Sequence, residues 1–142
     1  MSSRSLVIGP ITALALFGAA CTSDDGGEPS GDGIAATLTD FAIDLGETSA
    51  PAGPVTFDIT NDGATVHEFE VLRTDTDADA LPVDSGVVQT SADGIEIVDE
   101  VEEIAPGTGA GLSVELQPGT YAVICNVAGH YEQGMFTTFT AE

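Results

Sequence analysis

The chain has 142 residues and a formal net charge of −22, with 24 Asp and Glu against two Lys and Arg. This balance excludes nucleic-acid binding, because contacts with phosphate groups depend on Lys and Arg. Hydrophobic residues make up 42% of the chain, which is enough for the core of one domain. The negative charge is consistent with a basic partner or a saline habitat, and the alternative is an acidic surface that is simply solvated.

The N-terminus has the pattern of an export signal. A positive charge at Arg4 is followed by an apolar run that begins at Leu6, and we assign residues 1–21 to the signal. Small residues directly before Cys21 predict a bacterial lipoprotein whose Cys21 carries lipid. Cleavage nearby and an uncleaved N-terminal anchor are the alternatives. Each predicts an exported domain, periplasmic or at the cell surface, whose membrane association is limited to its N-terminus.

Residues 22–33 contain no aromatic or aliphatic side chain and are predicted to be a flexible, acidic linker. The remaining residues, 34–142, are predicted to form one domain. No segment has a convincing 3.6-residue apolar repeat, whereas several short segments alternate apolar and polar residues between turn signals. We therefore expect an all-β fold, an antiparallel β-sandwich. The strands are expected at 34–45, 54–60, 65–72, 95–104, 112–116, 121–125 and 135–141.

The polar, Asp-rich segment 73–94 is expected to be a long loop. Within it, residues 75–86 begin like a calcium-binding loop, but Ala80 and Gly86 stand where such a loop needs Gly and Glu. The Gly-rich segment 106–111 lacks the Lys of a phosphate-binding loop. Cys125 has a neighbouring His but no further parts of a nucleophilic site. The sequence therefore predicts that the protein is not an enzyme.

Four side chains that bind soft metals remain after the leader and its boundary are set aside: His67, Cys125, His130 and Met135. Each alone has a structural interpretation, as a buried Cys, a core Met or a hydrogen-bonded His. Two imidazoles, a thiolate and a thioether together are the set of a type 1 copper site, with Met as a weak axial ligand. Structural zinc sites favour more thiolates and do not use Met. A Cys21–Cys125 disulfide is a further alternative.

The segment from Cys125 to Met135 has the spacing C-x4-H-x4-M and resembles the C-terminal copper loop of the cupredoxins. The spacing is most similar to that of the auracyanin, rusticyanin and sulfocyanin branch. The strand around His67 resembles the family's first-histidine strand, and the resemblance covers residues 34–142. It implies a Greek-key β-sandwich, one type 1 copper ion and one-electron transfer. By the same resemblance His67 and His130 would be the imidazole ligands, Cys125 the thiolate and Met135 the axial ligand.

The resemblance also implies an apolar docking patch around the second His, here expected from Ala128, Gly129, Tyr131 and Gly134. The residue after the first His is often Asn or Ser in the family, whereas it is Glu68 here. Strand alternation points Glu68 away from His67, and the alternative is that its side chain approaches the metal. We expect a monomeric carrier that exchanges electrons with redox proteins, for which a basic partner would suit the acidic surface. The alternative is a copper-binding or copper-delivery protein without an electron-transfer partner.

Overall fold

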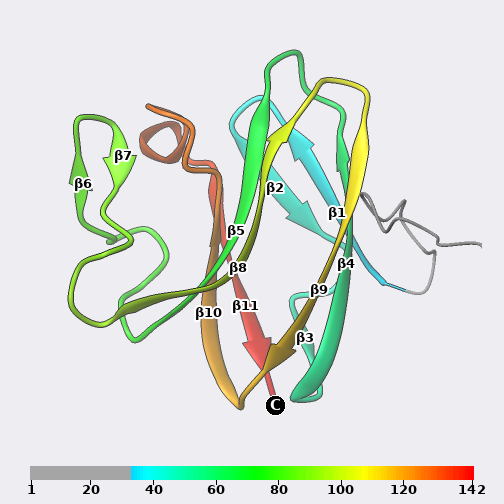
Figure 1. Ribbon diagram of the computed structural model, residues 1–142, viewed down its shortest axis with the longest axis vertical. Helices are drawn as coiled ribbons and strands as arrows, with labels where there is room; N and C mark the ends of the chain where they lie inside the picture. The colour runs from blue at the N-terminus through cyan, green and yellow to red at the C-terminus, as the bar shows by residue number, and fades with distance from the viewer. Residues whose placement is uncertain (1–32) are drawn as a thin grey trace, which may run out of the picture.

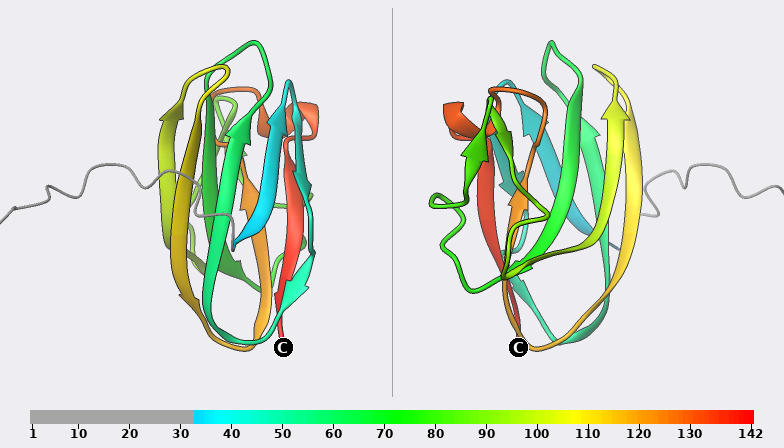
Figure 2. Two further views of the ribbon diagram at one scale, coloured as in Figure 1. Left: turned by 90° about the vertical axis from the view of Figure 1, so that its right-hand side faces the viewer. Right: turned by 60° about the vertical axis from the view of Figure 1, so that its left-hand side comes forward.

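The computed structural model describes residues 33–142, which form two β-sheets packed face to face (Figures 1 and 2). The first sheet has the order β2 (Ala42–Leu45), β1 (Ile34–Thr39), β4 (Gly53–Asn61), β9 (Gly109–Leu116). The second has the order β3 (Ser49–Ala50), β11 (Phe136–Ala141), β10 (Gly119–Ile124), β5 (His67–Thr74), β8 (Ile95–Ile104). A short hairpin of β6 (Val83–Asp84) and β7 (Val87–Val88) forms a separate two-stranded sheet. The predicted all-β sandwich is confirmed.

The strand pairs are antiparallel with two exceptions in the described part of the chain. β1 runs parallel to β4, and β3 runs parallel to β11. After β2 the chain crosses to the opposite sheet, where it forms β3. It then returns to the first sheet as β4, and both parallel pairs involve strands on either side of these crossings. The predictions for residues 1–21 and for most of the linker lie outside the described residues. Within residues 33–142 no helix is long and apolar enough to span a membrane.

The alternating residues of β4 explain how the sheets pack. Val55, Phe57 and Ile59 are buried in the main core, where side chains of both sheets meet. The ring of Phe57 lies 5.3 Å from that of Phe69 on β5 and 5.2 Å from that of Phe139 on β11. These tilted and edge-on contacts between rings stabilise the join between the sheets beyond the burial of apolar area.

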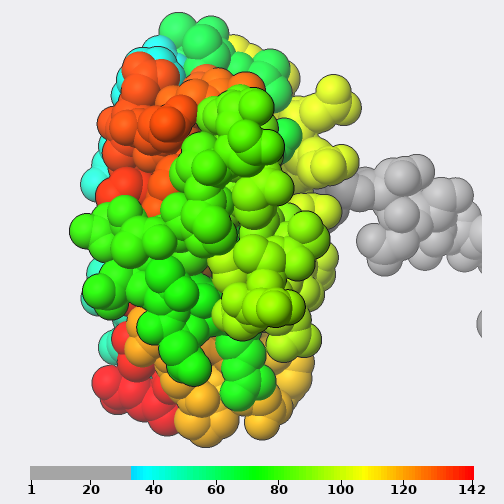
Figure 3. Space-filling view, turned by 90° about the vertical axis from the view of Figure 1, so that its left-hand side faces the viewer, coloured from blue at the N-terminus to red at the C-terminus, as the bar shows by residue number. Residues whose placement is uncertain are grey.

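A second apolar cluster lies on the outer face of the five-stranded sheet. Its buried members are Leu72, Ala78, Leu81, Val88, Ala122, Ile124 and Tyr131. Segment 75–94, expected to be only a loop, supplies three of these residues and contains the β6–β7 hairpin. Figure 3 shows this green segment spread over the side of the molecule, below and beside the orange loop that follows β10. The segment therefore acts as a cover for the sheet.

The expected single strand at 34–45 is instead two strands, β1 and β2, joined by a tight turn. The register pairs Thr39 with Ala42, which leaves Asp40 and Phe41 as the turn residues. Phe41 has a φ of 71°, a left-handed conformation that is uncommon for a residue other than Gly. The sequence concealed the turn because an aromatic residue occupies the position where Gly or Asn is usual.

Asn61, at the end of β4, holds together the loop that leads to His67. Its side-chain amide donates 2.8 Å hydrogen bonds to the carbonyls of Thr65 and Ile104, and its Oδ1 accepts a 2.9 Å bond from the amide of Gly63. The side chain is fully buried. The sequence contains only a turn signal here, because the hydrogen-bond partners of Asn61 are set by the tertiary structure.

We expect Asn61→Ala to lower the free energy of unfolding by about 3 kcal/mol, since buried backbone groups would lose their partners. Urea unfolding would measure the loss. The control is Thr56→Ala, which removes a 2.9 Å bond between the hydroxyls of Thr56 and Ser113 at the exposed surface. We expect the control to cost less than about 1 kcal/mol, and equal losses in the two variants would refute the assignment.

Candidate metal centre

His67 is the first residue of β5, which lies between β10 and β8 in the five-stranded sheet. β5 pairs with β10, so the start of β5 lies beside the end of β10, where Cys125 follows Ile124. Both side chains are fully buried in the described structure. The sheet register therefore brings the first His and the Cys together although they are far apart in the sequence.

His130 reaches the same point from the loop that joins β10 to β11. The amide of His130 donates to the carbonyl of Val127 at 2.9 Å, and the amide of Met135 donates to the carbonyl of His130 at 3.2 Å. The loop closes with a bond of 3.1 Å from the amide of Cys125 to the carbonyl of Met135. Gly134, with a φ of 105°, allows the reversal after the short helix η1 (Tyr131–Gln133). The backbone thus fixes all three sequence-predicted residues of this loop.

Three donor atoms of these residues converge. Sγ of Cys125 lies 3.5 Å from Nδ1 of His130 and 3.8 Å from Nδ1 of His67, and the two nitrogens are 3.2 Å apart. Ligands about 2.0 to 2.3 Å from a shared ion in a trigonal plane would be separated by roughly 3.5 to 3.7 Å. The spacing of the three atoms fits one metal ion bound through two imidazole nitrogens and one sulfur. Among the described residues, this is the one group of His, Cys or acidic side chains with such convergence.

Met135 belongs to the same corner of the fold. Its side chain is fully buried in the main core cluster, as is that of Cys125, and its backbone bonds to both Cys125 and His130. Two imidazoles, a thiolate and a thioether are the donor set of a type 1 copper site. The structure thus brings Met135 beside Cys125 and His130 through its backbone.

Burial favours the uncharged forms of Cys125 and His67 when no metal is bound. Burial raises the pKa of the Cys125 thiol, while hydrogen bonds from the amides of Glu68 and Val127 act to lower it. Burial lowers the pKa of His67, and a charge on His130 would lower it further, whereas Asp40 acts to raise it. A neutral imidazole can bind a metal, and a cation favours loss of the thiol proton.

The backbone of Glu68 is hydrogen-bonded to Cys125. The amide of Glu68 donates a hydrogen bond of 3.3 Å to Sγ of Cys125. Burial raises the pKa of the Glu68 carboxyl, and the charges of Glu102, Glu100 and Glu103 raise it further. The charge of Glu68 in turn acts to raise the pKa of Cys125. The N–H group that Glu68 donates to Sγ of Cys125 could be supplied by any residue except Pro.

Comparison with known families identifies the chain. Residues 47–142 match the model of the Sulfocyanin (SoxE) domain. The chain belongs to this family. The predicted resemblance to the cupredoxins, close to the auracyanin and sulfocyanin branch, is therefore confirmed. A comparison with curated protein sequences finds no significant match.

Solved structures share the fold of this sulfocyanin domain at low sequence identity. A dithionite-reduced auracyanin from Roseiflexus castenholzii has a TM-score of 0.59 and 21% identity, over 76% of this chain and 94% of that chain. An azurin (Az-iso2) from Methylomonas sp. strain J has a TM-score of 0.56 and 17% identity, over 76% and 95%. Auracyanin A from Chloroflexus aurantiacus, described as a "blue" copper protein, has a TM-score of 0.52 and 21% identity, over 76% and 99%.

In the sulfocyanin domain, the segment that contains β6 and β7 is hydrogen-bonded to the loop that carries His130. These contacts were not predicted from the sequence. The amide of Gly129 donates to the carbonyl of Gly86 in the β6–β7 turn at 2.8 Å. Asn126, next to the Cys, accepts from the amide of Val88 at 2.7 Å and donates to its carbonyl at 3.3 Å. The segment that covers the outer face of the sheet therefore also holds the loop that carries His130.

Tyr131 was expected in an exposed patch, and this expectation was wrong. Its ring is buried, and its hydroxyl donates to the carbonyl of Ala78 at 2.8 Å and accepts from the amide of Leu81 at 3.0 Å. An amphipathic Tyr can face the interior when its hydroxyl finds partners there. Of the other three expected patch residues, Ala128 and Gly134 are exposed and Gly129 is half-buried.

Proposed function

We propose that this domain is an exported, mononuclear type 1 copper protein that carries single electrons between redox partners and is not an enzyme. The buried convergence of two imidazole nitrogens and one sulfur is the observation that supports this function most directly. His67, Cys125 and His130 would hold the copper ion, with Met135 as its axial ligand. When bound, copper supplies a Cu(II)/Cu(I) couple that gains and loses one electron.

The residues around the site suit a carrier that changes oxidation state without rearranging. Backbone hydrogen bonds from β5, from the ligand loop and from the β6–β7 turn fix the positions of the donor atoms. Burial of His67 and Cys125 keeps water away from them. Four protein donors also leave no open position for a substrate, which favours electron transfer over catalysis.

His130 provides the route to a partner, because it is the ligand nearest the surface, with 9% of its area exposed. The ring of Phe41 contacts it edge-on at 5.2 Å, and Val66, which is 43% exposed, precedes the other His ligand. We propose that a redox protein docks on these apolar residues, and that the excess of acidic residues favours a basic partner. The carrier would act as a monomer, held at the membrane only through its N-terminus if Cys21 carries lipid.

The test is to add one equivalent of Cu(II) to the full chain and record visible and EPR spectra before and after ascorbate. We expect an intense thiolate-to-copper band that bleaches on reduction and returns on reoxidation. Absence of the band would refute the proposal. Competition with a copper chelator distinguishes an electron carrier from a copper-delivery protein. A carrier should keep its copper through repeated redox cycles, whereas a delivery protein should release it to the chelator.

A further inference from the structure

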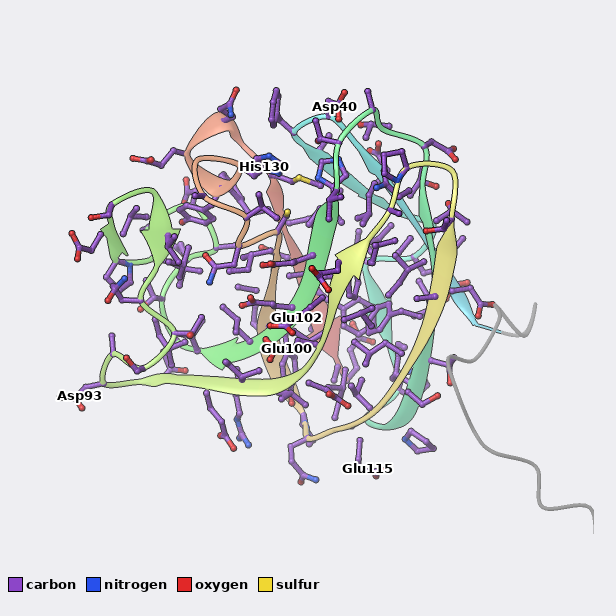
Figure 4. The ribbon with its side chains drawn as sticks, turned by 45° about the horizontal axis from the view of Figure 1, so that its top comes forward. Asp40, Asp93, Glu100, Glu102, Glu115 and His130 are labelled. Carbon is purple, nitrogen blue, oxygen red and sulfur yellow. The ribbon has the colours of Figure 1, made fainter. Side chains whose placement is uncertain are left out.

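The turn between β1 and β2 contacts both histidines of the metal centre. Oδ1 of Asp40 lies 3.4 Å from Nε2 of His67, and the ring of Phe41 packs edge-on against His130. Figure 4 shows Asp40 and His130 at the same end of the sandwich. Both turn residues precede residues 47–142, the part of the chain that matches the family model. The turn is therefore a feature of this chain that the family match does not cover.

The nitrogen of His67 that faces away from the site needs a hydrogen-bond acceptor. Nδ1 of His67 points toward Cys125 and His130, so a metal ion bound there requires the ring proton to reside on Nε2. Nε2 is buried and makes no hydrogen bond of good geometry with residues 33–142. In that part of the chain, Oδ1 of Asp40 is the one acidic oxygen within 4.0 Å of it. A buried N–H group without a partner is costly, which makes this carboxylate the natural acceptor.

Asp40 is itself held in place. Its carboxylate accepts bonds from the amide of Ala64 at 3.1 and 3.2 Å, from the amide of Thr65 at 3.3 Å and from the hydroxyl of Thr65 at 3.0 Å. These donors belong to the loop that leads directly into His67. The negative charge is thus fixed beside the imidazole by the same loop that positions it.

Gly63 leaves the space in which this contact forms. A Cβ atom at position 63 would lie 2.7 Å from Oδ1 of Asp40 and 2.8 Å from Nε2 of His67. Real Cβ atoms essentially never approach so closely, so any side chain here would push the carboxylate and the imidazole apart. The contact between Asp40 and His67 therefore depends on the absence of a side chain at Gly63.

We propose that Asp40 is a positioning residue that keeps the proton of His67 on Nε2, leaves Nδ1 free for the metal, and favours Cu(II) over Cu(I). A carboxylate bonded to the outer nitrogen of a metal-binding His fixes its tautomer and makes it a more basic ligand. The fixed negative charge also stabilises the more positive ion. The effect on copper rests on the proposed function, whereas the effect on the tautomer does not.

The first test needs no copper. In ¹⁵N NMR spectra of the metal-free full chain, we expect His67 to be the Nε2–H tautomer. Asp40→Ala removes the acceptor and should shift His67 toward a mixture of tautomers. Asp40→Asn, which retains a carbonyl oxygen, should keep the wild-type tautomer. An unchanged His67 tautomer in Asp40→Ala would overturn the positioning role.

The second test measures the reduction potential of the copper-loaded chain. At a fixed applied potential, we expect Asp40→Asn to raise the ratio of Cu(I) to Cu(II) about tenfold, which is about 59 mV for one electron. Gly63→Ala keeps the charge but opens the contact, so it should raise the ratio too. The matched control is Asp93→Asn, an exposed carboxylate well away from this end of the molecule (Figure 4).

We expect the control to change the ratio less than twofold. Equal shifts in Asp40→Asn and Asp93→Asn would show that only net charge matters and would overturn the proposed effect on copper. Absence of a copper band in the wild type would refute the proposed function and the effect on the potential together. The tautomer measurement would still decide whether Asp40 sets the protonation of His67.

Discussion

Cys125→Ser is expected to remove essentially all of the intense visible absorption of the copper-loaded protein. The band depends on charge transfer from a thiolate to copper, and a serine hydroxyl cannot replace that donor. The substitution should leave the fold intact, because Ser is similar in size to Cys and its oxygen can accept the bond that the amide of Glu68 donates to Sγ. Visible spectra after addition of one equivalent of Cu(II) would measure the loss.

Two variants make this result specific. Cys21→Ser removes the other cysteine of the chain and should leave the band unchanged. Met135→Leu replaces the thioether with an apolar side chain of similar volume, so it should keep the band and change the reduction potential. A full band in Cys125→Ser, or its loss in Cys21→Ser, would contradict the assignment of Cys125 as the thiolate ligand.

The four donor residues could be predicted from the sequence because their residue types are rare in this chain and three of them lie close together in it. Cys125, His130 and Met135 share one loop, and His67 lies on a strand whose alternation points it into the sandwich with Phe69. No long-range pairing had to be known to identify these residues. The residues that support them were missed, because the contacts of Asn61, Asp40 and Gly63 depend on which loops meet at one end of the fold.

The outer cover of the sheet was missed for a different reason. Alternation of apolar and polar residues predicts one apolar face on each strand. β10 is instead buried on both faces, with Val123 in the main core and Ala122 and Ile124 in the second cluster. A strand with apolar residues on both faces indicates that both are covered. That signal in β10 could have shown that segment 75–94 packs against the sheet, despite its polar composition.

The same outer face carries a buried carboxyl group, that of Glu70 on β5. The side chain is 5% exposed, and its Oε2 has no hydrogen-bond partner among the described residues. Glu100 is its register partner on β8, and Figure 4 shows Glu100 and Glu102 next to each other there. Burial, followed by the charges of Glu100, Glu68 and Glu102, raises the pKa of Glu70 to about 7, although a hydrogen bond with Asn126 acts to lower it.

This pKa links stability to pH. Below pH 4.5 the carboxyl is protonated in both the folded and the unfolded chain. Between pH 4.5 and about 7 the folded protein keeps a proton that the unfolded chain has lost, so the free energy of unfolding falls as the pH rises through this window. Above about pH 7 the folded protein must bury a carboxylate among other carboxylates. The cost of the raised pKa is then roughly 3 kcal/mol.

Glu70→Gln should therefore raise the free energy of unfolding by roughly 3 kcal/mol at pH 8 and change it little at pH 4.5. The amide has the shape of the carboxyl group but no charge to bury. Urea unfolding of the metal-free protein at both pH values measures the difference without involving the copper site. Glu115→Gln, the same change at an exposed position on β9, serves as the control and should show no such dependence on pH. A gain that is equal at the two pH values would mean that packing, and not the charge of Glu70, limits the stability of this face.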